Sequence, residues 1–256
     1  MYLSAVTRQV VAGVAVLGAT FAVGVYIGKR YFMYRRRKSQ KMFDGQYDPR
    51  REYLLRLSLR EHPAGKKLRQ RLSGITPQDI SCDAAQLLAN LAKMINSKKI
   101  LDMGWSYGYN PLVMALVLPS DGKLIANVRD TEDVTCAREY WSEANVNVKI
   151  DVRVQPEEQT LDELLSVGEA TSFDFIFINM ADEQNCKKCY EKCLRLLRCG
   201  GILAIDGVLC SGAVLRNGET ERVQGMRQMN EAILRDARVY LSILPLADGL
   251  MLCFKL

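Results

Sequence analysis

Residues 101–112 read Leu-Asp-Met-Gly-Trp-Ser-Tyr-Gly-Tyr-Asn-Pro-Leu, and this stretch decides the fold class. A short apolar run closes on Asp102, two glycines stand four apart at Gly104 and Gly108, and an apolar helical run follows. This is the pattern of a strand, a tight turn and a helix N-terminus, and ligands of open α/β sheets bind beyond the carboxyl ends of such strands. The spacing is not G-x-G-x-x-G and lacks the Lys-Ser/Thr of a P-loop, so a smaller nucleoside-like cofactor is favoured over a dinucleotide or a triphosphate. The alternative is an ordinary βα turn without a ligand.

Apolar runs and helical stretches alternate on both sides of this turn. Strands are predicted at 99–103, 123–128, 148–154, 173–178 and 201–205. Helices are predicted at 50–72, 83–96, 110–118, 132–143, 157–167, 183–197 and 219–235. Two further runs, 239–244 and 250–256, flank Ala247-Asp248-Gly249, which is a hairpin signal. We therefore predict a parallel, doubly wound sheet that ends in an antiparallel hairpin.

The N-terminus carries the pattern of a membrane anchor. Residues 10–28 contain no charge, and as a helix they would span roughly 28 Å, close to the thickness of a bilayer core. Basic residues at 29–30 and 35–38 outnumber Arg8 on the other side, which puts the bulk of the chain on the cytosolic or inner side. We predict a single-pass membrane protein of the endoplasmic reticulum or the mitochondrion. Small residues four apart in this run also fit a homodimer, but a simple tether is favoured.

The net positive charge of the chain comes from this end. Residues 1–43 hold eight Lys or Arg and no acidic residue, whereas the remainder holds 27 basic and 29 acidic residues. The net charge of +6 therefore points to a membrane or targeting segment, and we expect no nucleic-acid partner. The predicted domains are 1–43, the anchor with its basic flank, and 44–256.

Cysteine and histidine offer two further kinds of site. Cys186, Cys189 and Cys193 share one face of a predicted helix with leucines, so buried packing is favoured over a zinc site. His62, the single histidine, precedes Pro63 in a charged helical region, which disfavours a catalytic dyad.

Several segments together resemble a known family. They are 60–63 (Arg-Glu-His-Pro), 83–91, the glycine turn, 160–165, 193–197, 200–204 and 248–250. Over about residues 50–256 the chain is similar to the catechol O-methyltransferase domain-containing proteins, which belong to the cation-dependent O-methyltransferases. The resemblance implies a Rossmann-like sheet of seven strands with a reversed last hairpin, S-adenosyl-L-methionine as cofactor, and a small methyl acceptor.

The resemblance assigns the glycine turn to the methionine part of the cofactor. Its cofactor-binding residues then become Asp102, Gly104, Trp105, Gly108, Tyr109, Asn110 and Asp130. Trp105 replaces a small residue, and Asn110 replaces a serine. Val128 stands where the family has an acidic residue that accepts hydrogen bonds from the ribose, and Asp130 is a substitute acceptor if the strand slips.

The implied cation site departs further from the family. Its first ligand position becomes Asn179 or Met180, its lysine becomes Glu183, and its Asp-Asn pair becomes Asp206-Gly207. Asp206 and Asp182 are the candidate ligands for Mg²⁺, with Asn179 as a carbonyl donor. The alternative assigns Asp182 to a helix cap and Asp206 to a loop.

Two functions follow from the resemblance. The first is a membrane-anchored O-methyltransferase that acts on a small hydroxylated substrate, with a catechol as the specific candidate. The second is a catalytically inactive binding or scaffold protein with the same fold, which the changes at 105, 128, 180, 183 and 207 favour.

Overall fold

The computed structural model describes residues 49–73, 81–104, 107–128, 131–179, 186–216 and 220–256, with the backbone alone for 131–133. The chain divides into two units, Met1–Gln46 and Tyr47–Leu256, and all the described residues belong to the second. The predicted anchor at 10–28 lies outside the described residues. Within the described part, every helix is too short or too polar to cross a membrane.

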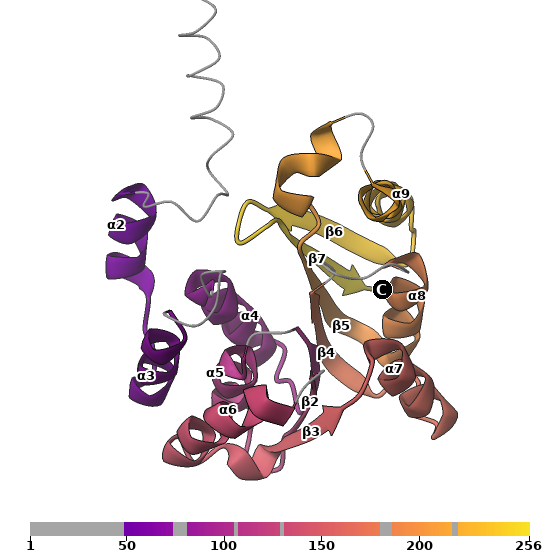
Figure 1. The fold of residues 1–256 in the computed structure, drawn as a ribbon. Coiled ribbons are helices and arrows are strands. Elements are labelled where there is room, and N and C mark those ends of the chain that lie inside the picture. Colours follow the sequence, from indigo (N-terminus) through magenta and orange to yellow (C-terminus); the bar gives the residue numbers. More distant parts are fainter. Residues whose placement is uncertain (1–48, 74–80, 105–106, 129–130, 180–185, 217–219) are drawn as a thin grey trace, which may run out of the picture. The chain divides into compact units, whose positions relative to one another are not determined.

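The second unit is built on one sheet of seven strands in the order β3-β2-β1-β4-β5-β7-β6 (Figure 1). The strands are β1 Lys99–Met103, β2 Lys123–Val128, β3 Ile150–Val154, β4 Phe173–Asn179, β5 Leu197–Asp206, β6 Val239–Leu244 and β7 Leu250–Lys255. The first five are parallel, and β7 runs antiparallel to both β5 and β6. The prediction of a Rossmann-like sheet that ends in a reversed hairpin is confirmed.

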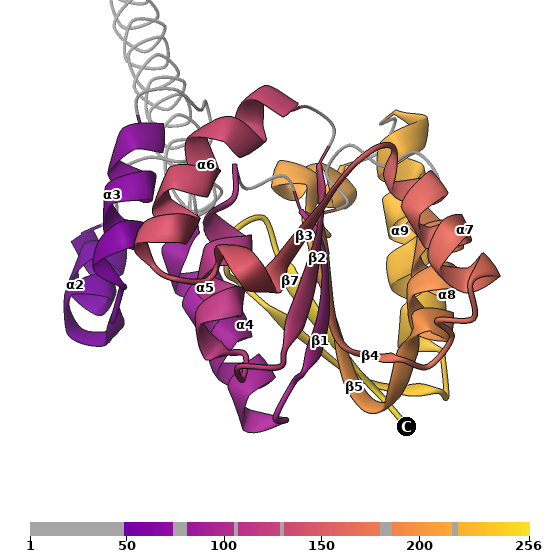
Figure 2. The ribbon, with the colours of Figure 1, turned by 90° about the horizontal axis from the view of Figure 1, so that it is seen from below.

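Helices cover both faces of the sheet (Figure 2). One face carries α4 Cys82–Met94, α5 Tyr109–Val117 and α6 Thr131–Glu143, and the other carries α7 Glu157–Ser166, α8 Cys186–Leu196 and α9 Glu221–Leu234. Successive strand residues alternate between the two faces, so that Ile100 packs in one hydrophobic cluster and Leu101 in the other. The described residues also include the 3₁₀ segments Asn147–Lys149 and Cys210–Leu215, the second of which is kinked at Ser211 and Gly212, where φ is positive.

The predicted helix at 50–72 is wrong in one respect, because the structure has two helices there. They are α2 Pro49–Ser58 and α3 Pro63–Leu72. Proline disfavours helical dihedrals in the residue before it, and His62 accordingly has φ −64° and ψ 143°. His62 caps α3, since its Nδ1 accepts a hydrogen bond from the Ala64 N–H at 3.2 Å. The histidine therefore has a structural contact at a helix start.

Candidate functional site

The predicted turn lies where the carboxyl ends of β1 and β2 meet the starts of α5 and α6. A small pocket that is partly open to solvent is found there. Its lining is largely apolar and comes from the two strand ends, the turn and both helices: Asp102, Gly104, Tyr107, Gly108, Pro111, Ala126, Asn127, Val128, Val134 and Trp141. Asp102, Gly104 and Gly108, which the sequence singled out, are thus brought together at one cavity.

Asp102 is the one acidic side chain in this lining. Its side chain is buried, and its Oδ1 accepts a hydrogen bond from the Gly104 N–H at 2.9 Å. Its Oδ2 is buried without a hydrogen-bond partner. Burial raises the pKa of the Asp102 carboxyl to about 7, because the charged form loses its hydration. A cationic ligand group in the cavity would supply the missing partner and favour the charged form.

The two glycines are required by neighbouring side chains. A Cβ on Gly104 would lie 2.3 Å from Cε1 of Phe177 on β4. A Cβ on Gly108 would lie 2.3 Å from Cβ of Ala137 on α6, and Gly108 also has φ +80°. In the structure, close packing against β4 and α6 requires both.

Trp141 is a part of the site that the sequence analysis missed. Its indole is buried, lines the cavity, and donates an N–H hydrogen bond to the Gly108 carbonyl at 2.9 Å. Tyr107 also lines the cavity and has φ +48°, in the left-handed region next to Gly108. The sequence signal for Trp141 was only its place on the apolar face of a helix, which is typical of a core residue.

Tyr109 lies outside the cavity lining, on the α3 side of α5. Its buried hydroxyl donates to Glu61 Oε1 at 2.7 Å, and the Arg69 guanidinium binds both oxygens of Glu61 at 2.8 and 2.7 Å. Burial, the largest single influence, by itself raises the pKa of the Glu61 carboxyl. The hydrogen bonds from Arg69 and Tyr109 and the positive charge of Arg69 together outweigh burial, so the pKa of Glu61 is lowered. Tyr109 thus ties the first turn of α5 to α3. Asn110, the next residue of α5, is half-buried.

The end of β2 places Val128 at the cavity. Val128 is the last residue of the strand, and its carbonyl accepts from the Gln155 N–H at 3.1 Å. Its side chain offers no acceptor to a ligand. Asn127 is buried and held by Thr160 and by the Gln155 carbonyl, 2.9 Å from its Nδ2. Trp105 and Asp130 lie outside the described residues, and their predicted contacts stay predictions.

Two of the candidate cation ligands, Asn179 and Asp206, lie at the ends of β4 and β5. Asn179 is the last residue of β4 and pairs in register with Asp206, the last residue of β5. The structure thereby puts Asn179 at the strand end; Met180 lies outside the described residues. Burial, with a smaller effect from the Asp248 carboxylate, raises the pKa of Asp206 to about 6. Asp206 Oδ1 accepts from the Gly207 N–H at 2.7 Å.

This donor set is incomplete for Mg²⁺ among the described residues. Magnesium prefers about six oxygen ligands in octahedral geometry. Asp206 and Asn179 supply one carboxylate and one amide, and both oxygens of the neighbouring Asp248 accept from the Ser211 N–H at 2.7 and 2.8 Å. The described part contains no group of three or more His, Cys, Asp or Glu placed for a metal ion. Asp182 and Glu183 lie outside the described residues.

The helix cysteines lie in the hydrophobic core. Cys186, Cys189 and Cys193 are buried on α8, among leucines and methionines of α7 and α9. This agrees with the packing interpretation favoured for them.

Comparisons with known proteins agree on one family. A family model described as O-methyltransferase matches residues 56–256. Mouse catechol O-methyltransferase domain-containing protein 1 is 47% identical over 248 residues, which cover 95% of this chain and 94% of the relative.

Two solved structures show the same architecture. The O-methyltransferase from Bacillus cereus, in complex with SAH, is 27% identical with a TM-score of 0.70, and the match covers 80% of this chain and 96% of that one. The O-methyltransferase TomG from Streptomyces achromogenes, in complex with SAM, is 25% identical with a TM-score of 0.70, over 79% and 94% of the two chains. The match to the family model and the mouse relative both span most of the chain, so the protein belongs to the O-methyltransferase family.

Proposed function

We propose that this protein is an S-adenosylmethionine-dependent O-methyltransferase that acts on a small hydroxylated acceptor. One observation carries the proposal: buried Asp102, whose Oδ2 has no hydrogen-bond partner, lines a cavity on the glycine turn. The cofactor has an α-ammonium group, and a buried carboxylate next to a turn suits such a cation. The SAM and SAH complexes of the similar bacterial enzymes support this assignment.

Each part of the cavity has a role in this proposal. Asp102 binds the ammonium group, and the backbone between Gly104 and Gly108 carries the methionine end of the ligand. Ala126, Val128 and Trp141 provide apolar surface for its nucleoside end. When bound, the cofactor supplies a methyl group on a sulfonium, and the protein contributes proximity and in-line orientation of the acceptor hydroxyl.

The acceptor belongs at the ends of β4 and β5, beside Asn179 and Asp206. A catecholic acceptor is the specific form of this proposal, because the resemblance and the name of the mouse relative point to catechols. The described donors do not complete a magnesium site, so the proposal includes no step through a cation.

A non-catalytic ligand-binding role is the second candidate. Neutral side chains at the strand ends favour it, since Val128 and Asn179 occupy positions where the resemblance implies carboxylates. Both candidate functions agree with the family and with the unpartnered Oδ2 of Asp102. They differ in whether a methyl group is transferred, and not in whether the cofactor binds.

Attachment to a membrane through residues 10–28 belongs to the same proposal. The uncharged run and its basic flank support a single-pass tether of the endoplasmic reticulum or mitochondrion, with the catalytic unit on the cytosolic or inner side. A homodimer through small residues of this run is the less favoured extension.

Methyl transfer tests the enzyme against the binding protein. The full chain is incubated with methyl-labelled S-adenosylmethionine and a panel of catechols, monophenols and aliphatic alcohols, with Mg²⁺ or with a chelator. The enzyme predicts labelled product from at least one acceptor class, and loss of product in the Asp206→Asn variant. Cofactor binding without product from any acceptor would identify the non-catalytic protein.

A further inference from the structure

Helices α2 and α3 concentrate positive charge on one part of the second unit. Residues 49–73 hold eight Arg or Lys against two Glu, whereas residues 74–256 hold 19 basic and 25 acidic residues. Six of the eight basic residues are exposed: Arg50, Arg56, Arg60, Lys66, Lys67 and Arg71. The charge of the unit is therefore uneven, with a net positive segment at α2 and α3 and a net negative remainder.

Ion pairs neutralise only part of this charge. Arg51 binds Asp83 at 3.2 Å and Lys67 binds Glu143 at 2.6 Å, and both acids come from neighbouring helices. When Asp83 and Glu143 are counted with residues 49–73, a net charge of +4 is left.

Three large apolar side chains of α2 are also exposed. Tyr53, Leu54 and Leu57 are 55%, 61% and 65% exposed. Their spacing places them within one sector of the helix, of about 100°, in which Arg50 also falls. The Arg56 guanidinium lies 5.4 Å from the centre of the Tyr53 ring, so cationic and apolar groups adjoin. No residue of α2 is fully buried.

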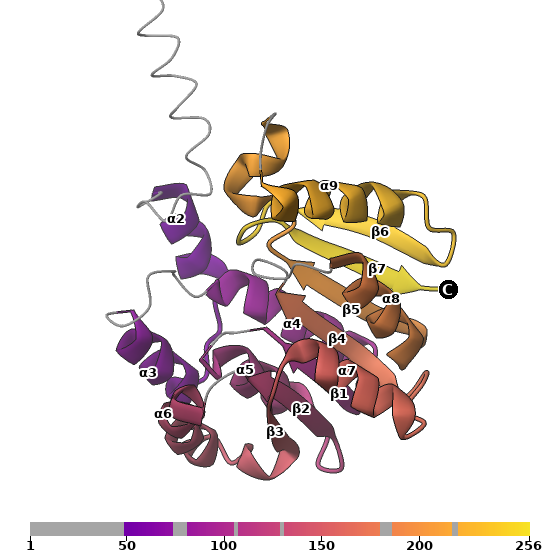
Figure 3. The same cartoon turned by 45° about the vertical axis from the view of Figure 1, so that its right-hand side comes forward.

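The two helices form one outer layer. In Figures 1, 2 and 3, α2 and α3 lie together on the outside of α4, α5 and α6, away from β6 and α9. We call the exposed residues Tyr53, Leu54 and Leu57, together with the six exposed basic residues, the α2–α3 surface.

We propose that the α2–α3 surface lies on the headgroup region of a membrane that contains anionic lipid. Basic side chains with adjacent aromatic and aliphatic side chains are typical of helices that rest in a lipid interface. A nucleic acid would use the charges but would leave the exposed leucines without a partner. The inference rests on the proposed membrane attachment. Twenty residues, 29–48, separate the proposed anchor from α2, which is the described element closest to it in the sequence.

Fluorescence quenching by brominated lipid tests this contact in the full chain. Tyr53→Trp places a reporter on the α2–α3 surface, and Tyr240→Trp makes the same change at an exposed tyrosine of the edge strand β6. The parent protein, with Trp105 and Trp141, gives the baseline. Each protein is reconstituted into vesicles of brominated phosphatidylcholine, with and without phosphatidylserine. Equal unfolding midpoints verify that both variants keep the fold.

The proposal predicts that tryptophan fluorescence is quenched more in Tyr53→Trp than in the parent. This quenching should be stronger with phosphatidylserine and weaker in high salt, and Tyr240→Trp should be quenched no more than the parent. Arg56→Gln in the Tyr53→Trp background reduces the contact, since each basic residue near an anionic leaflet contributes a factor of about five in partitioning. Quenching of Tyr53→Trp no greater than the parent, or equal quenching at both sites, would overturn the proposal. RNA binding that Arg56→Gln abolishes and Leu57→Ser leaves unchanged would assign the surface to nucleic acid instead.

The outcomes separate this inference from the attachment on which it rests. A chain that does not float with vesicles refutes both the tether and the lipid-facing surface. A chain that floats with Tyr53→Trp unquenched refutes the surface alone.

Discussion

The turn that contains Asp102, Gly104 and Gly108 combines a buried carboxylate with two glycines that neighbouring side chains require. Asp102 keeps a buried carboxylate oxygen without a partner, which is costly unless a ligand uses it. The glycines are required by Phe177 and by Ala137, whose positions leave no room for a Cβ. The turn is therefore held by packing from β4 and α6, and its carboxylate is left to the ligand.

Gly104→Ala is expected to destabilise the fold by about 1–3 kcal/mol, because the new Cβ would overlap the buried Phe177 ring. Urea unfolding measures this loss. Gly225→Ala on α9 is the matched control, since its Cβ would meet nothing within 4 Å, and it should be neutral or slightly stabilising. Equal effects of the two substitutions would contradict the packing role of Gly104.

Val128→Glu is expected to tighten S-adenosylmethionine binding by about tenfold, because it supplies an acceptor for the ribose hydroxyls at the end of β2. The control is Val154→Glu, the same change at the register partner of Val128 on β3, which should leave affinity unchanged. Calorimetric titration gives both values. Weaker or unchanged binding in Val128→Glu would show that the ribose does not lie at this strand end.

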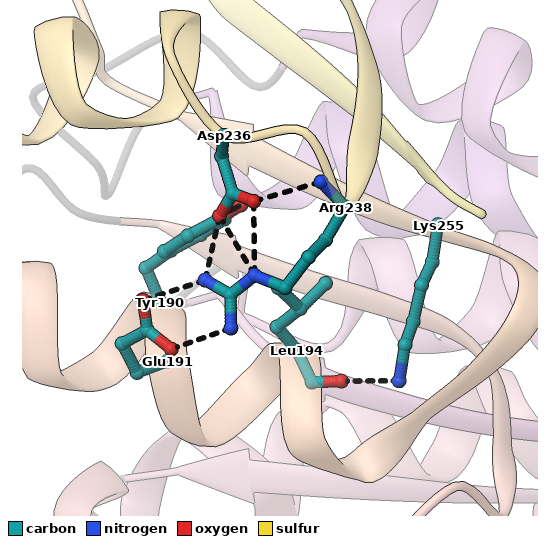
Figure 4. Close-up of polar contacts among 6 residues, drawn as sticks. All are labelled: Tyr190, Glu191, Leu194, Asp236, Arg238 and Lys255. Atoms are coloured by element: carbon teal, nitrogen blue, oxygen red, sulfur yellow. Dashed lines mark hydrogen bonds and ion pairs between the residues drawn. The ribbon is translucent and has the colours of Figure 1, made fainter.

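Two groups of polar contacts join neighbouring elements at opposite sides of the second unit. On one side, Glu61 links α3 to α5 through Arg69 and Tyr109. On the other, Arg238 at the start of β6 binds Asp236 at 2.6 Å and Glu191 of α8 at 2.8 Å, and Tyr190 donates to Asp236 at 2.9 Å (Figure 4). Lys255 of β7 donates to the Leu194 and Leu197 carbonyls at 2.8 and 2.6 Å, so the hairpin is fastened to the end of α8.

Asp236→Asn is expected to cost about 1–2 kcal/mol, because Asp236 is nearly buried while its partner Arg238 is half exposed. Hydrogen bonds from Arg238 lower the pKa of Asp236 to about 2, against about 3.9 in an unfolded chain. The stability difference from the parent is thus full above about pH 4 and disappears as the pH falls through 2.

Urea unfolding at several pH values measures this difference. Glu231→Gln, in an exposed pair with Arg235, is the control and should change stability by less than about 0.5 kcal/mol. A pH-independent loss in Asp236→Asn would contradict the ionic origin of the contact.

The periodicity of the sequence predicted the elements and the reversed hairpin, because strand and helix patterns are local. It missed the break before Pro63, where one proline outweighed a continuous helical pattern. It also missed Trp141, because a cavity residue and a core residue share the same helical spacing. The resemblance assigned Tyr109 to the cofactor, and nothing in the sequence indicated that its hydroxyl donates a hydrogen bond to Glu61.

The net charge of the second unit is positive at helices α2 and α3 and negative over the rest of its sequence. The second unit is acidic beyond residue 73, and its basic helices α2 and α3 follow the basic N-terminal segment. The residues of the α2–α3 surface, which we propose to contact lipid, differ from those that line the cavity at β1 and β2.

Deletion of residues 1–38 is expected to move most of the protein from the membrane pellet to the supernatant, because it removes the apolar run and the basic flank. Fractionation with a salt wash distinguishes a spanning segment from a surface contact. A deletion variant that stays in the pellet after the salt wash would contradict the anchor.

The central claim is that Asp102 and the glycine turn bind S-adenosylmethionine, and calorimetric titration of the full chain tests it most directly. The parent should bind the cofactor at one site, and more weakly as the pH falls below about 7, since the Asp102 carboxylate then takes up a proton. Asp102→Asn should weaken binding at least about tenfold, and Asp121→Asn at an exposed turn should not change it. Absence of binding heat up to millimolar cofactor, or an Asp102→Asn variant that binds like the parent, would contradict the account.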